Sequence, residues 1–190
     1  KLDGEIIVRR GREGEKLVLL DESEVELNEG VLAICDAQGP VAIAGIMGGL
    51  DTGVTENTRD ILFESAYFNP ATIMGKARNF GMHTDSSHRF ERGVDAAGQE
   101  AAIERATDLL IEIAGGEPGP LLVEEDREHV PVNPPVKLRP ERLDMVIGCA
   151  IPRDSVENIL ERLGMDVEWD GSAWTVTAPS ARFDIDIEEE

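Results

Sequence analysis

Short runs of β-forming residues dominate the first third of the chain. Residues 4–34 contain four such runs, separated by Gly, Asp-Glu and Asn-Glu-Gly turns, and this pattern predicts an antiparallel meander. Residues 41–47, VAIAGIM, are apolar without interruption and predict a fully buried strand. Residues 59–68, RDILFESAYF, predict a further strand that carries Glu64 in its middle.

Two helices are predicted in the middle of the chain. Asn69 is a suitable N-cap, Pro70 a suitable first helical residue, and Gly81 a suitable end for the first helix. The second helix is expected to start at Asp95 and to run through Ile113. Their buried faces are predicted to consist of Ile73, Met74, Ala77 and Phe80 in the first helix, and of Ala102, Ile103, Ala106, Leu109, Leu110 and Ile113 in the second.

The composition changes after the second helix. Residues 117–135 hold five prolines and five acidic residues, which indicates a stiff, solvated linker and a domain boundary. A short strand, a helix that Gly148 is expected to end, a second helix and a hairpin follow, in the order of a winged helix. The predicted fold class is therefore α+β: mixed and antiparallel sheets with packed helices in a domain of residues 1–123, a linker at 124–136, and a small winged-helix-like α+β domain at 137–190. The buried face of its second helix is expected to consist of Val156, Ile159, Leu160 and Leu163.

The net charge narrows the range of partners. The chain has 39 Asp and Glu against 18 Lys and Arg, a net charge of −21, whereas a nucleic-acid binder normally presents a basic face. Residues 137–190 alone hold thirteen acidic and six basic residues, so we exclude a DNA-binding role. An RNA partner would have to be held mainly by other parts of the protein. No membrane contact is expected, because no apolar run approaches the ~18 residues of a span.

The two cysteines give no sign of metal binding. Cys35 and Cys149 lie far apart in the sequence, without the spacing of a zinc site. We expect both to be small buried residues of a protein in a reducing cytosol.

One carboxylate and one glycine cluster are candidates for chemistry. Glu64 lies in an apolar strand, and charged residues are rarely buried without a partner, so its side chain points either to solvent or into a pocket. The apolar setting favours the pocket. Gly45, Gly48 and Gly49 end the buried run without the Lys-Ser/Thr of a phosphate-binding loop. They fit the close approach of a ligand to the backbone better than phosphate binding.

Residues 83–89, HTDSSHR, are predicted to form a loop rich in hydrogen-bonding groups. His83, Asp85 and His88 could bind a metal, although their spacing matches no common zinc signature. Ser, His and Asp could form a catalytic triad, although no G-x-S-x-G motif is present. The interpretation that we favour is that these side chains hydrogen-bond locally and line a pocket.

Three motifs carry a family resemblance. The segments GIMGG (Gly45–Gly49), LFESAYFNP (Leu62–Pro70) and HTDSSHRFERGVD (His83–Asp95) resemble, in order and spacing, the β chain of bacterial phenylalanyl-tRNA synthetase. The resemblance covers nearly all 190 residues. Because that β chain is several times longer, the sequence is expected to be an internal part of one.

The resemblance implies a proofreading domain, which hydrolyses tyrosine wrongly attached to phenylalanine tRNA. Glu64 matches the family residue that accepts the tyrosine hydroxyl, Gly48 matches a pocket glycine, and Thr84 matches a threonine near the substrate's amino end. Ser86 is a departure, since better-known members have Ala there. The family's catalytic-site His falls upstream of Lys1, so no catalytic residue is assigned and residues 1–190 are expected to have little or no hydrolytic activity alone.

The resemblance also implies partners and cofactors. The partners would be the synthetase α chain, with which the β chain forms a heterotetramer, phenylalanine tRNA, and tyrosine or phenylalanine. ATP would be a substrate of the whole cytoplasmic enzyme. Asp184 and Glu190 match the first two positions of a magnesium site, although the family usually has Asp at the second. No cofactor is expected to bind residues 1–190 tightly.

A second interpretation assigns the chain no chemistry. It would then be a structural module that docks the α chain and positions tRNA, a role expected of residues 137–190 in either case. The surroundings of Glu64 distinguish the two interpretations. A structural module would pair Glu64 with an Arg, whereas an editing pocket would leave it facing a cavity.

Overall fold

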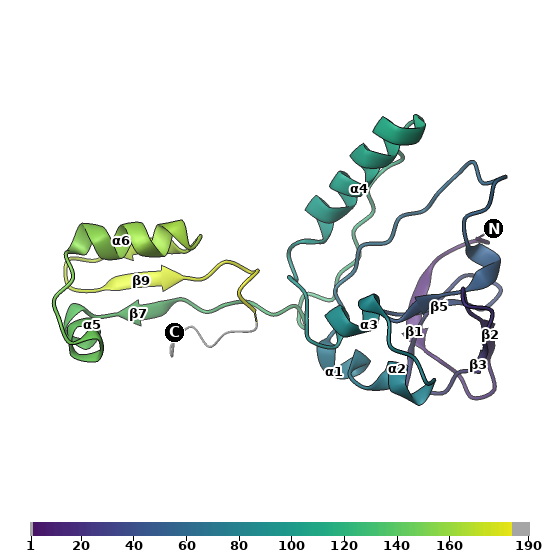
Figure 1. Ribbon diagram of the computed structural model, residues 1–190, viewed down its shortest axis with the longest axis horizontal. Coiled ribbons are helices and arrows are strands. Elements are labelled where there is room, and N and C mark those ends of the chain that lie inside the picture. Colours follow the sequence, from purple (N-terminus) through teal and green to yellow (C-terminus); the bar gives the residue numbers. More distant parts are fainter. Residues whose placement is uncertain (1, 184–190) are drawn as a thin grey trace. The chain divides into compact units, whose positions relative to one another are not determined.

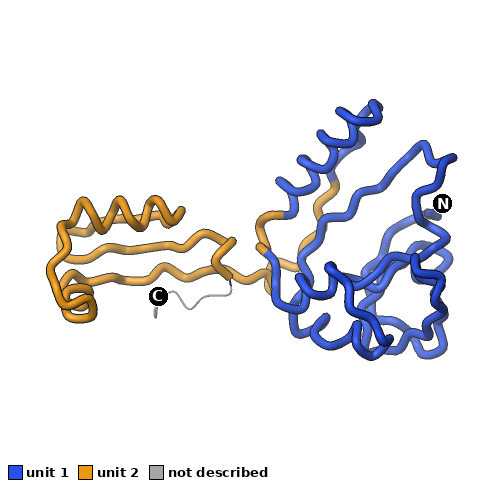
Figure 2. The backbone as a smooth tube through the Cα atoms, viewed as in Figure 1, with its two compact units in different colours: residues 1–94, 99–121 blue, residues 95–98, 122–190 orange. Residues whose placement is uncertain are grey.

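The computed structural model describes residues 2–183 and confirms an α+β fold with antiparallel sheets (Figure 1). The chain divides into two compact units (Figure 2). The first comprises residues 1–94 and 99–121, and the second comprises residues 95–98 and 122–190. Among the described residues, no helix has the length and apolar character needed to cross a membrane.

The first unit is built on a four-stranded antiparallel sheet and a separate hairpin. The sheet has the order β1-β4-β5-β6, and the hairpin consists of β2 and β3. The strands are β1 (Ile7–Arg10), β2 (Lys16–Val18), β3 (Glu24–Glu26), β4 (Leu32–Cys35), β5 (Pro40–Ile43) and β6 (Met47–Gly48).

The predicted meander is wrong in its pairing, because β1 pairs with β4 and not with β2. The intervening β2–β3 hairpin closes on itself through a tight turn, in which the Ser23 amide and hydroxyl both donate to the Asp21 carboxylate, at 3.0 and 2.6 Å. Each of its strands buries only its central residue, Leu17 or Val25. This local closure leaves β1 free to join the central sheet.

The predicted strand at residues 41–47 is in fact two strands and a turn. β5 ends at Ile43, and the Ile46 amide donates to the Ile43 carbonyl oxygen at 3.0 Å before β6 begins. Gly45 takes a φ of +67°, which disfavours any residue with a Cβ. The turn could not be predicted from the pattern of apolar and polar residues, because Ala44 and Ile46 on either side of Gly45 are themselves apolar and buried.

Residues 59–69 follow a 3-10 turn, η1 (Leu50–Thr52), and form no strand, contrary to the prediction. Ile61, Leu62 and Phe63 are exposed. A strand is defined by hydrogen bonds to a neighbouring strand, and this segment pairs with none of the described strands. The residue types of this segment are typical of a strand, but they do not show whether a neighbouring strand pairs with it.

The helix predicted after Asn69 is divided in two. The Asn69 side chain caps α1 (Pro70–Ile73) as predicted, accepting from the Ala71 amide at 3.0 Å. Gly75, at a φ of +73°, then separates α1 from α2 (Lys76–Asn79). Ile73 and Ala77 are buried as expected, but the break turns Met74 outward, so its predicted burial is wrong.

The next two helices also differ from expectation. The loop predicted at 83–89 is largely a helix, α3 (Asp85–Phe90). The long helix, α4 (Gln99–Ala114), starts four residues later than predicted and buries none of its residues fully. Of its predicted apolar face, Ile103, Ala106 and Leu110 are half-buried, whereas Ala102, Leu109 and Ile113 are exposed.

The core of the first unit lies between the sheet, the β2–β3 hairpin and the short helices. Its fully buried side chains include Leu19, Leu27, Val31, Cys35, Ile43 and Ile73. The Phe68 and Phe90 rings lie 5.3 Å apart and join the segment before α1 to α3. This core fixes the β5–β6 turn and α3, the two elements that carry most of the candidate residues.

The second unit is a three-stranded antiparallel sheet with two helices, and its elements occur in the predicted order. They are β7 (Val136–Leu138), α5 (Pro140–Ile147), α6 (Arg153–Arg162), β8 (Asp166–Trp169) and β9 (Trp174–Thr177), with the sheet order β7-β9-β8. Trp174 is the largest buried side chain of a small core, and α6 lies along the sheet beside β8 (Figure 1). Gly148 ends α5 at a φ of +86°, as its position predicted.

Two burial predictions fail in this unit. Val156 and Leu160 of α6 face the core, but Ile159 and Leu163 are about half exposed. Cys149 is exposed, whereas Cys35 is buried as expected. Both failures have one cause: among the described residues, the buried core of this unit consists of only four side chains, so α6 and the α5–α6 loop can bury only one side.

Candidate functional site

A hydrogen bond from the Thr84 side chain joins the N-terminus of α3 to the β5–β6 turn. The Thr84 hydroxyl donates to the Ile46 carbonyl oxygen at 2.9 Å and also accepts from the Ser87 amide at 2.9 Å. The Ser87 hydroxyl accepts from the Thr84 amide and donates to the Thr84 carbonyl, both at 3.0 Å. This reciprocal capping box satisfies groups that a helix start leaves without partners. Local hydrogen bonding in this segment is thus confirmed.

The same geometry corrects the other interpretations of residues 83–89. His83 and His88 lie edge to face, with ring centroids 5.7 Å apart, and His88 Nδ1 is 3.0 Å from an Arg92 guanidinium nitrogen. The described residues contain no group of three or more His, Cys, Asp or Glu side chains arranged to hold a metal. No described hydrogen bond joins a serine to either histidine, so the structure supports neither the metal site nor the catalytic triad.

Gly48 lies in β6, two residues after the carbonyl group that Thr84 contacts. Its own carbonyl accepts from the Leu20 amide at 3.1 Å, and a Cβ at this position would lie 3.3 Å from Leu20 Cδ1. At Gly49 a Cβ would lie 2.6 Å from the Val41 carbonyl oxygen, and at Gly45 it would lie 3.1 Å from the Phe90 ring. Packing within the chain therefore accounts for Gly45 and Gly49, whereas Gly48 has only a flexible side chain beside it.

Glu64 belongs to the extended segment before α1 and is exposed to solvent. Desolvation by the surrounding protein nevertheless raises the pKa of its carboxyl group above the usual value. The two observations agree for a side chain that touches water on one side while protein surrounds the rest, and the surface exposure limits the size of the effect. No described Arg or Lys pairs with Glu64, as expected if it is not a purely structural carboxylate. Glu64 lines neither of the described cavities, so the pocket expected for it stays a prediction.

The four candidate residues are only partly brought together. Ser86 is half-buried in the first turn of α3, next to Thr84, and Thr84 reaches the turn that leads to Gly48. Glu64 shares no described hydrogen bond with the other three. Its segment is joined to α3 through the Phe68–Phe90 contact.

Ser87 is a buried polar residue that sequence reasoning missed. It is 3% exposed and makes three hydrogen bonds with Thr84. The usual capping box has Glu or Gln at the third helical position. The pattern Thr-x-x-Ser at Thr84–Ser87 could have indicated a capping box, but it has Ser in place of the usual Glu or Gln.

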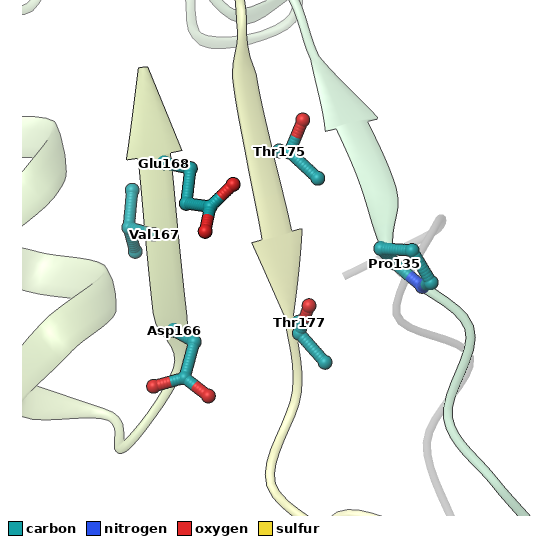
Figure 3. Close-up of a pocket in the computed structure, with 6 residues that line it drawn as sticks. All are labelled: Pro135, Asp166, Val167, Glu168, Thr175 and Thr177. Atoms are coloured by element: carbon teal, nitrogen blue, oxygen red, sulfur yellow. The ribbon is translucent and has the colours of Figure 1, made fainter. Parts of the chain in front are cut away.

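Two cavities are described in the second unit, and none of the candidate residues lines either of them. The larger, about 500 Å³, is shown in Figure 3 and is lined by Pro135, Asp166, Val167, Glu168, Thr175 and Thr177. Glu168 and Thr175 are register partners on β8 and β9. A smaller hollow of about 240 Å³ is lined by Arg139, Glu141, Arg142 and Met145. The larger cavity has two carboxylates and no basic residue in its lining, which does not favour a phosphate group.

The predicted magnesium ligands cannot be placed in this site. Asp184 and Glu190 both lie outside the described residues.

Two family models match the chain. The B3/4 domain matches residues 1–115, and the tRNA synthetase B5 domain matches residues 136–190. The two matches cover most of the two structural units.

Several curated proteins are similar to the whole chain. The phenylalanine–tRNA ligase beta subunit of Methylococcus capsulatus is 52% identical over 188 residues, which are 99% of this chain and 24% of that protein. The beta subunit of Xanthomonas campestris pv. campestris is 53% identical over 189 residues, and that of Yersinia pestis is 51% identical over 190 residues. The chain spans about a quarter of the length of these relatives, 24% in each case. It therefore belongs to the B3/4 domain family, carries a tRNA synthetase B5 domain after it, and is similar throughout to one part of phenylalanine–tRNA ligase beta subunits.

Proposed function

We propose that residues 1–123 form the editing domain of a phenylalanine–tRNA ligase beta subunit, which hydrolyses the ester of tyrosine wrongly attached to phenylalanine tRNA. The observation that carries this proposal is the state of Glu64. It is a solvent-exposed carboxylate that the protein desolvates on one side and that no described cation neutralises. Such a group can accept a hydrogen bond from a ligand in place of water, and the phenol of tyrosine is a suitable donor.

The physical need for such a site follows from the chemistry of the two amino acids. An apolar pocket for phenylalanine rejects an analogue with one extra hydroxyl by only about 10²-fold. A second pocket that requires the hydroxyl discriminates better. Phenylalanine that covered Glu64 would exclude water from the carboxylate without giving it a donor, and a buried group left unpaired in this way costs about 1–3 kcal/mol. Selective hydrolysis in that pocket then removes the error.

The remaining candidates take positions around the amino acid. Gly48 would let the substrate approach the backbone, Thr84 would lie near the amino group, and Ser86 would border the pocket. The bond between Thr84 and Ile46 supports this grouping, because it holds the start of α3 beside the turn that leads to Gly48. Ser86 adds a polar group where an alanine would leave none, and is expected to alter the hydration of the ester.

The test is hydrolysis of tyrosyl-tRNA and phenylalanyl-tRNA by the full-length beta subunit with its alpha subunit. Glu64→Gln removes the charge with little change of shape and is expected to lower the preference for tyrosine at least tenfold. Glu56→Gln is the matched control, an exposed glutamate near the start of the same loop. An unchanged preference in Glu64→Gln would reject the proposed role.

The whole protein is proposed to attach phenylalanine to its tRNA in the cytoplasm, with ATP as a substrate and the alpha subunit as a partner. The names of the similar proteins support this assignment. Magnesium is proposed as a cofactor of the whole enzyme, with Asp184 and Glu190 as two of its ligands. We assign no step to the metal.

A non-catalytic docking role is a second candidate for residues 137–190. Met145, Val146 and Ile147, at the end of α5, are at least half exposed. An exposed apolar group of this kind is typical of a surface that contacts another protein chain. We propose the alpha subunit as that chain, because the acidic character of this unit disfavours tRNA. Met145→Glu should weaken the assembly of the two subunits in size-exclusion chromatography, and unchanged assembly would reject this role.

A further inference from the structure

The hydroxyl group of Thr84 has its hydrogen-bonding direction fixed by its neighbours. A threonine hydroxyl offers one proton and two lone pairs. Its proton is used on the Ile46 carbonyl oxygen, and one lone pair accepts the Ser87 amide. Within the described residues, one lone pair is left. Thr84 can therefore accept a further hydrogen bond, but it cannot donate one without losing its contact to the turn.

Ser87 maintains this arrangement. Its hydroxyl exchanges two hydrogen bonds of 3.0 Å with the Thr84 backbone, and its amide supplies the third bond to the Thr84 side chain. The residue is buried, so water does not compete readily for these bonds. If the Ser87 hydroxyl were lost, the Thr84 amide would lose its partner and Thr84 could turn away from Ile46.

We propose that Ser87 is a positioning residue for the editing reaction: it holds Thr84 as a hydrogen-bond acceptor for the α-amino group of the aminoacyl ester. This inference rests on the proposed function. The chemistry matches, because an amino group offers N–H donors whether or not it is protonated. A threonine that could only donate would not serve a protonated amino group. The same contact would orient the ester carbonyl, which is one bond from the carbon that carries the amino group.

The proposal is tested with two substrates that differ only at the amino group. One is tRNA charged with tyrosine, and the other is tRNA acylated with desaminotyrosine, which lacks the α-amino group. In the full-length enzyme we expect Ser87→Ala to lower kcat/KM for the tyrosyl ester about tenfold, the size of a hydrogen bond to a charged group. It should leave kcat/KM for the desamino ester unchanged. Ser87→Thr, which keeps the hydroxyl, should recover most of the loss.

A matched control separates this role from a general loss of stability. Asn69→Ala likewise removes a side chain that caps a helix N-terminus in the first unit, and it should leave both substrates unaffected. If Ser87→Ala slows both esters equally, or slows neither, the positioning role is wrong. If wild-type enzyme does not prefer tyrosyl-tRNA, or Glu64→Gln leaves that preference intact, the proposed function itself fails and this inference with it.

Discussion

The Thr84 hydroxyl donates a hydrogen bond to the Ile46 carbonyl oxygen, 2.9 Å away and 38 residues earlier in the chain. This bond joins a helix start to a tight turn between two strands. It holds together two of the three motifs that carry the family resemblance. The position of the candidate site thus depends on one side chain with both a structural and a proposed functional role.

Two substitutions of Thr84 should distinguish the effect on stability of losing its hydroxyl group from the effect of changing its shape. Thr84→Val is nearly the same size but removes the cap and leaves the Ile46 carbonyl without its donor. We expect it to lower the free energy of unfolding by about 1–3 kcal/mol. Thr84→Ser keeps the hydroxyl and should cost less than half as much. Urea denaturation of the two variants measures the difference, and equal losses would show that the hydroxyl is not the stabilising group.

The β5–β6 turn requires glycine at position 45 for two reasons. Its φ is +67°, and a Cβ would lie 3.1 Å from the Phe90 ring. Gly14 has a similar φ of +80° but no neighbouring atom within 4 Å of the Cβ position. Gly14→Ala should therefore cost only the backbone strain, about 1–2 kcal/mol, and Gly45→Ala should cost more. Urea denaturation of both variants measures the difference, and equal destabilisation would indicate that the Phe90 contact is unimportant.

Asp170 should make the second unit sensitive to acid. Its carboxylate accepts from the Ser172 amide and hydroxyl and from the Ala173 amide, each at 2.8 Å, and from Lys137 at 3.1 Å. The backbone amides are the main cause that holds the pKa of this carboxyl well below its usual value. Because the carboxyl has a lower pKa in the folded state, its ionisation stabilises the fold at pH values above the pKa of the unfolded state, which is near 4. This contribution is lost as the pH falls toward the pKa of the folded state.

The measurement is thermal unfolding between pH 7 and pH 2, followed by tryptophan fluorescence, since both tryptophans, Trp169 and Trp174, lie in the second unit. Asp170→Asn should remove most of the decline below about pH 4. Asp166→Asn replaces an exposed carboxylate on β8 and is the control. An Asp170→Asn protein that keeps the full acid sensitivity would contradict this explanation.

The preference for tyrosine should depend on pH through Glu64. Desolvation raises the pKa of this carboxyl, so its protonation begins at a higher pH than for an ordinary glutamate. Protonation removes the charge that strengthens the bond to the phenol, so the preference for tyrosine should fall as the pH is lowered. In Glu64→Gln the weak remaining preference should not vary with pH. Hydrolysis of the two esters between pH 8 and pH 5 provides the test, and a flat wild-type profile would contradict it.

Local signals in the sequence predicted local structure well. The Asn69 cap, the Pro70 start and the Gly148 stop all act at the predicted positions, because caps and left-handed glycines depend on nearby backbone groups. The order of helices and strands in the second unit was also predicted correctly from local signals of this kind. The α+β class was correct, as was the family, which three motifs with their order identified.

The predictions that failed depend on contacts between residues far apart in the sequence, or on features that leave no mark in the pattern of apolar and polar residues. The turn at Gly45 lies inside an apolar run because the turn itself is buried, so no polar residue marks it. The segment around Leu62 has the composition of a strand but pairs with none of the described strands. Ser87 stayed unnoticed because its importance comes from the bond between Thr84 and Ile46, which no local pattern predicts. The roles of Gly48, Glu64, Thr84 and Ser86 stay predictions.

The central claim is that Glu64 recognises the hydroxyl of tyrosine. Isothermal titration calorimetry of free tyrosine and free phenylalanine, with the wild type and with Glu64→Ala, tests it most directly. We expect the wild type to bind tyrosine more tightly than phenylalanine, and Glu64→Ala to bind both equally. Equal binding of the two amino acids by the wild type, or a tyrosine preference that survives in Glu64→Ala, would contradict it.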